Sequence, residues 1–172
     1  MNLYGYASGD PINYHDPFGL SCEPRSAPSS RLLARCLQKY GRVTREEAAW
    51  ARANPGLAAI AAQARLFGSA AGEEIAAMFG GDDAIENAAR HMYGTCWMTY
   101  WYGESHAREV AEAHETNSPG SSTDDTANDR SNNERGYPAG NAARRDQASR
   151  SQADATCRSR TIGHIRAGDY AR

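Results

Sequence analysis

The sequence has no long hydrophobic run and little net charge. The first absence argues against a membrane-spanning helix, and the second means that overall charge does not indicate a partner. No apolar stretch among its 172 residues approaches the roughly 20 residues that a helix needs to span a bilayer. The opening residues, MNLYGYASGD, have no basic start and no apolar region, so they are not expected to form a signal peptide. A formal net charge of −2 does not by itself indicate a nucleic acid or a membrane as partner.

The cysteines also lack a familiar pattern, because Cys22, Cys36, Cys96 and Cys157 do not have the C-x-x-C spacing of zinc sites. Four cysteines allow two disulfides in three alternative pairings, or they are separate buried thiols. One hypothesis joins Cys96 to Cys157, and Cys22 to Cys36. Disulfides would indicate maturation outside a reducing cytosol.

Charge is unevenly distributed along the second half of the chain. The segment from Glu104 to Asp129 holds seven acidic residues and one arginine, whereas the segment from Arg130 to Arg172 holds nine arginines and four acidic residues. The favoured interpretation is that these segments pair with each other or form a solvated surface. The alternative is that the basic segment binds nucleic acid.

The spacing of apolar residues predicts an all-α, compact helical domain with a modest core. Mean hydropathy is −0.73, and no stretch has the alternation that is typical of a strand. Helices are expected over residues 31–41, 44–54, 57–81, 83–103 and 104–117, and more weakly over 142–160.

Glycine, proline and capping residues mark where these helices begin and end. Thr44 with Glu47 forms a capping-box pattern. The stretch 57–81 is expected to form either one helix or two, with Gly68 or Gly72 as the place of a break. Asp82 or Asp83 is expected to cap the helix that follows, and Gly103 is its stop signal. Residues 118–141 are polar and rich in turn residues, which predicts a mobile polar loop near 117–125 and a short helix from about Thr123.

The first twenty residues differ in character from the rest, because they combine aromatic residues with Gly, Pro and Asn. They contain the pattern Pro-x4-Asp-Pro-x-Gly-Leu at Pro11, Asp16, Pro17, Gly19 and Leu20. This segment resembles the end of the core domain of Rhs-repeat (rearrangement hotspot) proteins. Residues 1–20 are therefore interpreted as the end of an Rhs core with its self-cleavage motif, and 21–172 as a helical toxin domain.

The resemblance implies how such a domain is delivered. In Rhs proteins the core forms a β-cocoon that cuts its own chain after the Leu, with aspartates acting as in an aspartic protease. Asp16 should be inert here, because it needs partner groups from the rest of the cocoon. The implied partners are the parent Rhs core and a cognate immunity protein. The implied role is a secreted antibacterial effector, carried by a type VI secretion system into a target cell, with periplasm and cytoplasm both open as sites of action.

Candidate catalytic residues lie on the two helices that flank Gly103. His91 is twelve residues before Gly103 and His114 is eleven after it. At about 1.5 Å per residue, each histidine lies about 17 Å from the turn, so an antiparallel pair of helices brings both to the same level. Asp129 and Asn133 are four apart and share a face if this segment is helical.

These groups are suited to hydrolysis in two ways. His91, His114, Glu115 and Asp129 can bind a divalent metal ion, with Glu115 orienting or deprotonating a water. Without a metal, histidine and glutamate can act as acid and base while Arg90 stabilises negative charge. The predicted catalytic set is Arg90, His91, His114, Glu115, Asp129 and Asn133. The structural alternative is that each histidine is a hydrogen-bonded core residue.

The same residues resemble the motifs of an uncharacterised helical domain found at the C-termini of bacterial polymorphic toxins. Its elements correspond here to Arg90-His91, to Ala113-His114-Glu115, and to Asp129, Asn132, Asn133 and Gly136. One departure is Tyr137, where an aliphatic residue or Arg is expected. The resemblance implies no particular reaction.

Two other functions are kept as alternatives. Arg108 and His114 have the spacing of helical RNases that use such a pair at a dimer groove. The stretch HMYGTCWMTYWYG is amphipathic and aromatic, as in a membrane-disrupting, pore-forming toxin, although it equally suits a central core helix. The substrate stays open among nucleic acid, peptidoglycan, lipid and a nucleotide.

Overall fold

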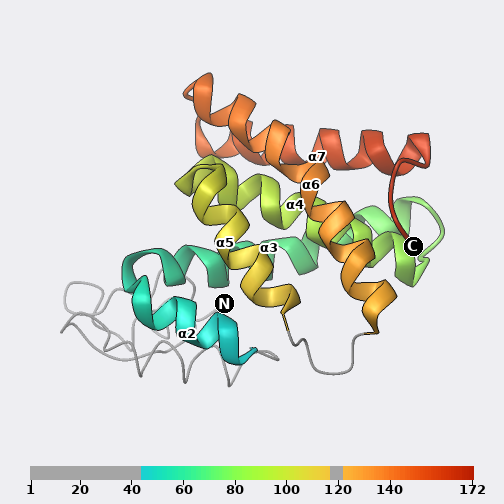
Figure 1. The fold of residues 1–172 in the computed structure, drawn as a ribbon. Helices are drawn as coiled ribbons and strands as arrows, with labels where there is room; N and C mark the ends of the chain where they lie inside the picture. The colour runs from blue at the N-terminus through green and yellow to red at the C-terminus, as the bar shows by residue number, and fades with distance from the viewer. Residues whose placement is uncertain (1–43, 117–121) are drawn as a thin grey trace, which may run out of the picture.

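The computed structural model describes residues 44–116 and 122–172, and this part of the chain is built from helices without a strand (Figure 1). The all-α prediction is confirmed. The helices are α2 (Arg45–Ala53), α3 (Pro55–Met78), α4 (Asp83–Tyr102), α5 (Glu104–Glu115), α6 (Thr123–Arg145) and α7 (Arg150–Ala167).

Helix α4 is the centre of the bundle. It packs against α3, α5, α6 and α7, and Figure 1 shows it between α3 on one side and α6 and α7 on the other. Its apolar run supplies the largest buried side chains, including Met92, Tyr93 and Trp97. Since burying such side chains is the main stabilising contribution in folding, this stretch forms the core.

The predicted ends of α2 and α4 and the predicted start of α5 are confirmed. Thr44 and Glu47 form the capping box of α2, and Asp82 caps α4 through the backbone N–H groups of Ala84 and Ile85. Gly103, with φ of 87°, separates α4 from α5. This backbone conformation favours glycine, which explains the sharp turn between the two helices.

Of the two alternatives for the stretch 57–81, the structure has the single helix, because α3 continues through Gly68 and Gly72. A Cβ at Gly72 would lie 2.9 Å from the carbonyl oxygen of Glu86, and one at Gly68 would lie 3.1 Å from that of Arg90. The two glycines therefore permit α3 to approach α4 closely rather than ending the helix.

The largest correction concerns the polar stretch 118–141, which is not a turn-rich segment with only a short helix. Ser122 caps α6 in a capping box with Asp125, and the helix continues through Pro138 to Arg145. The predicted loop near 117–125 therefore ends before Thr123, and residues 117–121 lie outside the described part. A Cβ at Gly136 would lie 2.0 Å from Thr95 Oγ1, so α6 packs closely against α4.

The weak helix expected over 142–160 is also corrected. A turn at residues 146–149 separates α6 from α7, and Gln147 within it has a positive φ of 49°. Ser149 begins α7 in a capping box with Gln152. Local capping chemistry thus divides a stretch whose composition suggested one helix.

Helix α7 is attached to the bundle by a disulfide between Cys96 and Cys157, whose Cα atoms are 5.7 Å apart. This half of the cysteine hypothesis is confirmed. The proposed Cys22–Cys36 pair lies outside the described residues, as do the expected helix over 31–41 and the motif of Asp16, Pro17, Gly19 and Leu20. No helix in the described ranges is both long and apolar enough to cross a membrane.

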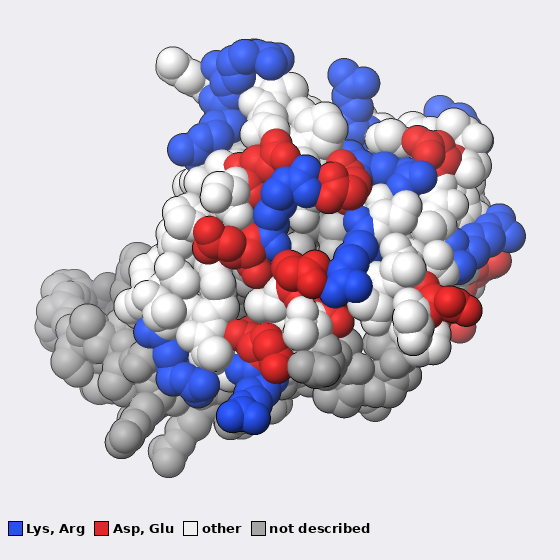
Figure 2. All heavy atoms as spheres, in the orientation of Figure 1, with Lys and Arg blue, Asp and Glu red and all other residues white. Residues whose placement is uncertain are grey.

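The acidic and basic segments pair across the surface, as expected. Arg130 of α6 forms an ion pair with Glu112 of α5, at 2.6 Å, and Arg108 of α5 pairs with Glu134 of α6. Figure 2 shows basic and acidic side chains interspersed on this face. Exposed pairs of this kind contribute little stability individually.

Candidate functional site

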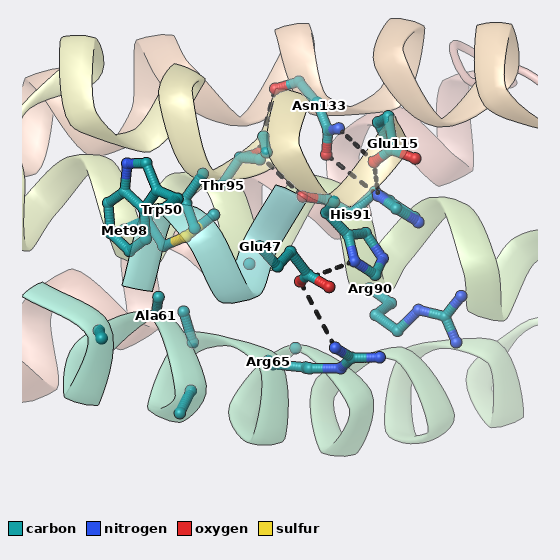
Figure 3. Close-up of a pocket in the computed structure, with 18 of the residues that line it drawn as sticks. Glu47, Trp50, Ala61, Arg65, Arg90, His91, Thr95, Met98, Glu115 and Asn133 are labelled. Atoms are coloured by element: carbon teal, nitrogen blue, oxygen red, sulfur yellow. Dashed lines mark hydrogen bonds and ion pairs between the residues drawn. The ribbon is translucent and has the colours of Figure 1, made fainter. Parts of the chain in front are cut away.

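A pocket of about 390 Å³ opens between α2, α3, α4 and α5, and Asn133 of α6 contributes to its wall. One end is polar and the other apolar (Figure 3). The polar end is lined by Glu47, Arg65, Arg90, His91, His114, Glu115 and Asn133. At the other end lie Trp50, Met98 and Ala61, with further alanines of α3.

The two histidines lie at the same level, as predicted. His91 projects from α4 and His114 from the last turn of α5, and their ring centroids are 6.0 Å apart. Suitable atoms of His91, His114 and Glu115 all lie within 4.8 Å of one another. The antiparallel arrangement set by Gly103 is responsible, because equal distances from the turn place residues side by side.

Asn133 connects His91 to Glu115. Its side-chain Nδ2 donates to Glu115 Oε1 at 2.9 Å, and its Oδ1 lies 3.1 Å from His91 Nδ1. Because the amide nitrogen faces the carboxylate, the amide oxygen must accept, and His91 Nδ1 carries the proton. Thr95 holds this part of α6 in place by donating to the carbonyl oxygen of Asn133 at 3.1 Å.

The other ring nitrogen of His91 faces Asp129. His91 Nε2 is buried and makes no hydrogen bond with any described residue, although Asp129 Oδ1 lies 3.4 Å away. Asn87 Nδ2 donates to the same Asp129 oxygen at 2.5 Å. Arg90 in turn donates to Asn87 Oδ1, so α4 and α6 share a continuous polar network.

Burial changes the protonation of these groups. Burial lowers the pKa of His91 to about 3, with Arg90 and His114 contributing, so the imidazole is neutral. Burial raises the pKa of Glu115 to about 6, and Asp129 adds to this effect. Burial also raises the pKa of Asp129, against its hydrogen bond from Asn87. The raised pKa of Glu115 lies closer to neutral pH, which suits this carboxyl group to proton transfer.

Glu47 is a site residue that the sequence analysis did not identify, because the capping box already accounted for it. Its Oε2 accepts from the backbone N–H of Thr44, while its Oε1 lies 2.9 Å from His114 Nδ1. Arg65 of α3 lies 3.5 Å from the same oxygen. Burial alone would raise the pKa of Glu47, but His114, the backbone of Thr44 and Arg65 together outweigh it, and the pKa lies below its usual range.

The structure brings together all six predicted site residues, in direct contact or through Asn87. It does not bring Arg108 to His114. Arg108 lies over the ring of Tyr137 at 4.1 Å and pairs with Glu104 and Glu134, on the wall of a second cavity of about 280 Å³. Arg108 and His114, the pair of the RNase hypothesis, therefore line different cavities.

Comparisons with models of known families, with curated proteins and with solved structures found no significant match to this chain. The described residues form an all-α domain with a buried site of histidine, carboxylate and carboxamide groups.

Proposed function

We propose that residues 21–172 are the toxin domain of an Rhs effector and that they act as a hydrolytic enzyme. The motif ending at Leu20 supports the first part. The second part is carried by one observation, the neutral His91 held between Glu115 and Asp129 next to a pocket. Structural polar residues normally satisfy their hydrogen bonds when buried, whereas His91 keeps one ring nitrogen without a donor.

The geometry supports water activation at the polar end of the pocket. A water there loses a proton to Glu115, and the resulting hydroxide attacks the electrophilic centre of the substrate. The same proton then passes to the leaving group, so water is added across the bond that breaks. Arg65 and Arg90 line this end and are placed to stabilise the negative charge that develops.

The apolar end of the pocket gives room for the non-reacting part of a substrate. Trp50, Met98 and Val110 line it together with small alanines. Binding energy from such a surface positions the reacting bond against the polar groups. The proposed biological setting is competition between bacteria, with a cognate immunity protein in the producing cell.

Growth inhibition by a Glu115→Gln variant tests the enzymatic part. The substitution is nearly isosteric and keeps an oxygen to accept from Asn133, but it removes the group that takes the proton. We expect a loss of roughly 100-fold or more in activity, which is typical for a general acid or base. Glu73→Gln is the matched control, because Glu73 is exposed on α3.

Circular dichroism must confirm that both variants are folded. A folded Glu115→Gln protein that inhibits growth as strongly as wild type contradicts the enzymatic proposal. A membrane-disrupting toxin predicts that outcome, since it does not require this carboxylate.

A further inference from the structure

We infer that His91, His114, Glu115 and Asp129 bind one divalent transition-metal ion of the zinc class. This inference rests on the proposed function and places a cation at the same polar end of the pocket. It depends on His91 Nε2, which lies 3.4 Å from Asp129 Oδ1 and makes no hydrogen bond with a described residue.

The position of the proton on the His91 ring determines what can lie next to Nε2. Asn133 fixes the proton on Nδ1, so a neutral ring has a lone pair on Nε2. Asp129 Oδ1 lies 3.4 Å from Nε2 and also presents lone pairs. His91 is only 7% exposed, so bulk water does not separate these atoms. Two buried acceptors facing each other are unfavourable unless a proton or a cation lies between them.

The separation of the two atoms suits a cation. Zinc ligands of nitrogen and oxygen lie about 2.1 Å from the ion, so two ligands in tetrahedral geometry are about 3.4 Å apart. The observed distance is 3.4 Å. Ligand atoms of His91, His114 and Glu115 all lie within 4.8 Å of one another, and Asp129 joins this group through His91. Small side-chain rotations would bring them onto one ion.

Each candidate ligand is also held by an outer partner. Asn133 contacts both His91 Nδ1 and Glu115 Oε1, Asn87 donates to Asp129, and Glu47 contacts His114 Nδ1. These contacts leave Nε2 of each histidine available. Metal-binding histidines characteristically have such a carboxylate or amide partner on the other ring nitrogen.

The donor set also indicates the kind of ion. Two imidazoles with two carboxylates favour zinc or a similar first-row ion, whereas magnesium and calcium prefer oxygen ligands throughout. Glu115 is only 3% exposed and Asp129 is buried beside it. Arg90 compensates part of this negative charge, and a divalent cation would neutralise the remainder.

Direct metal binding tests the inference on the tag-free 172-residue chain with its disulfide intact. After treatment with a chelator, the protein is titrated with zinc by calorimetry and with cobalt by visible absorption. We expect one ion per chain and, with cobalt, the intense visible bands of a tetrahedral site. Glu47→Gln should weaken zinc binding by roughly 10- to 100-fold, and Asp129→Asn or His114→Gln by more than that.

His106→Gln and His164→Gln are the matched controls. These histidines pair with exposed Glu109 and Asp169 away from the pocket, so their removal should leave zinc binding unchanged. Absence of stoichiometric binding, or equal binding by folded His114→Gln and wild-type protein, overturns the inference. If a proton, and not an ion, lies between His91 and Asp129, stoichiometric binding is expected to be absent.

The two proposals fail in different ways. If toxicity persists in chelator-treated protein without a bound ion, the enzymatic proposal stands and the metal inference is wrong. If the wild-type protein binds zinc stoichiometrically but its folded Glu115→Gln variant stays fully toxic, the metal inference stands and the enzymatic proposal is wrong.

Discussion

Asn133 is the residue that gives the site its chemistry. A carboxamide has one donating and one accepting end, so a single side chain can orient His91 and stabilise Glu115 at once. A carboxylate at this position would repel Glu115, and an apolar residue would leave both groups without a partner. The cost of the arrangement is the burial of two carboxyl groups close together.

This cost leads to a prediction about stability. The pKa of Glu115 is raised to about 6, so the folded state keeps a proton that the unfolded state has lost. The free energy of unfolding therefore falls as pH rises from about 4.5 to 6, by about 2 kcal/mol, and stays lower above that. In chelator-treated protein, Glu115→Gln should be more stable than wild type at pH 8.

Urea unfolding of both proteins at pH 5 and pH 8 measures the effect. The titration of His91 contributes to both proteins and cancels in the comparison. A wild-type protein that is as stable as Glu115→Gln at pH 8 would show that burial of this carboxylate is not destabilising.

Among the helices, α6 does most to assemble the site. It carries Asp129 and Asn133 on the face that meets α4, and Gly136 and Gly140 continue that face. A Cβ at Gly140 would lie 2.4 Å from the carbonyl oxygen of Cys96. The close approach that the glycines permit is what brings short Asp and Asn side chains within reach of His91.

Gly136→Ala should therefore damage both stability and function. Its Cβ would lie 2.3 Å from the carbonyl oxygen of Met92, so the helices must separate. Overpacking of this kind costs about 1–3 kcal/mol, and the separation should lower toxicity by moving Asp129 and Asn133 away from His91.

Gly163→Ala is the control, because nothing lies near a Cβ at this exposed position of α7. It should stabilise the protein by about 0.5–1 kcal/mol, since alanine is the better helix former. Chemical denaturation of the two variants tests the contrast. Equal midpoints for Gly136→Ala and wild type would mean that α6 does not need the close approach.

For the whole molecule, the Cys96–Cys157 disulfide joins the central helix to the C-terminal one. The bridge closes a loop with a sequence separation of 61 residues. Helix α7 has few large apolar residues of its own, and its buried side chains are Ala153, Cys157, Thr161 and Ile165. The covalent link therefore supplements weak packing.

Replacing both Cys96 and Cys157 by Ala should lower the free energy of unfolding by about 4 kcal/mol in the chain-entropy model. Urea unfolding measures the loss, and intact mass before and after reduction shows the two hydrogens that the bridge removes in the wild type. Unchanged stability in the double variant would mean that packing alone holds α7 on the bundle.

A second prediction at this scale concerns the longer parent protein implied by the Rhs motif. The chain should be severed between Leu20 and Ser21, and Asp16→Asn should prevent the cut because it removes a carboxylate needed to activate water. Intact-mass analysis of the purified parent decides this. An uncut wild-type parent would argue against the Rhs interpretation of residues 1–20.

The sequence alone was sufficient for features that depend on local interactions. The capping box at Thr44, the cap at Asp82 and the stop at Gly103 involve groups within a few residues of one another, so they can be read along the chain. The common level of His91 and His114 follows from the same local turn. The predicted site residues depended on this geometry, and their catalytic role stays a prediction.

Only the tertiary structure decided what depends on contacts between distant segments. The sequence around Gly136 and Pro138 favours a turn, but packing against α4 stabilises a continuous helix and overrides that preference. Glu47 reaches His114 only because α2 lies against α5, and the choice of Cys157 for Cys96 requires α7 to lie on α4. Such contacts combine many weak interactions across the bundle, and no short stretch of sequence contains them.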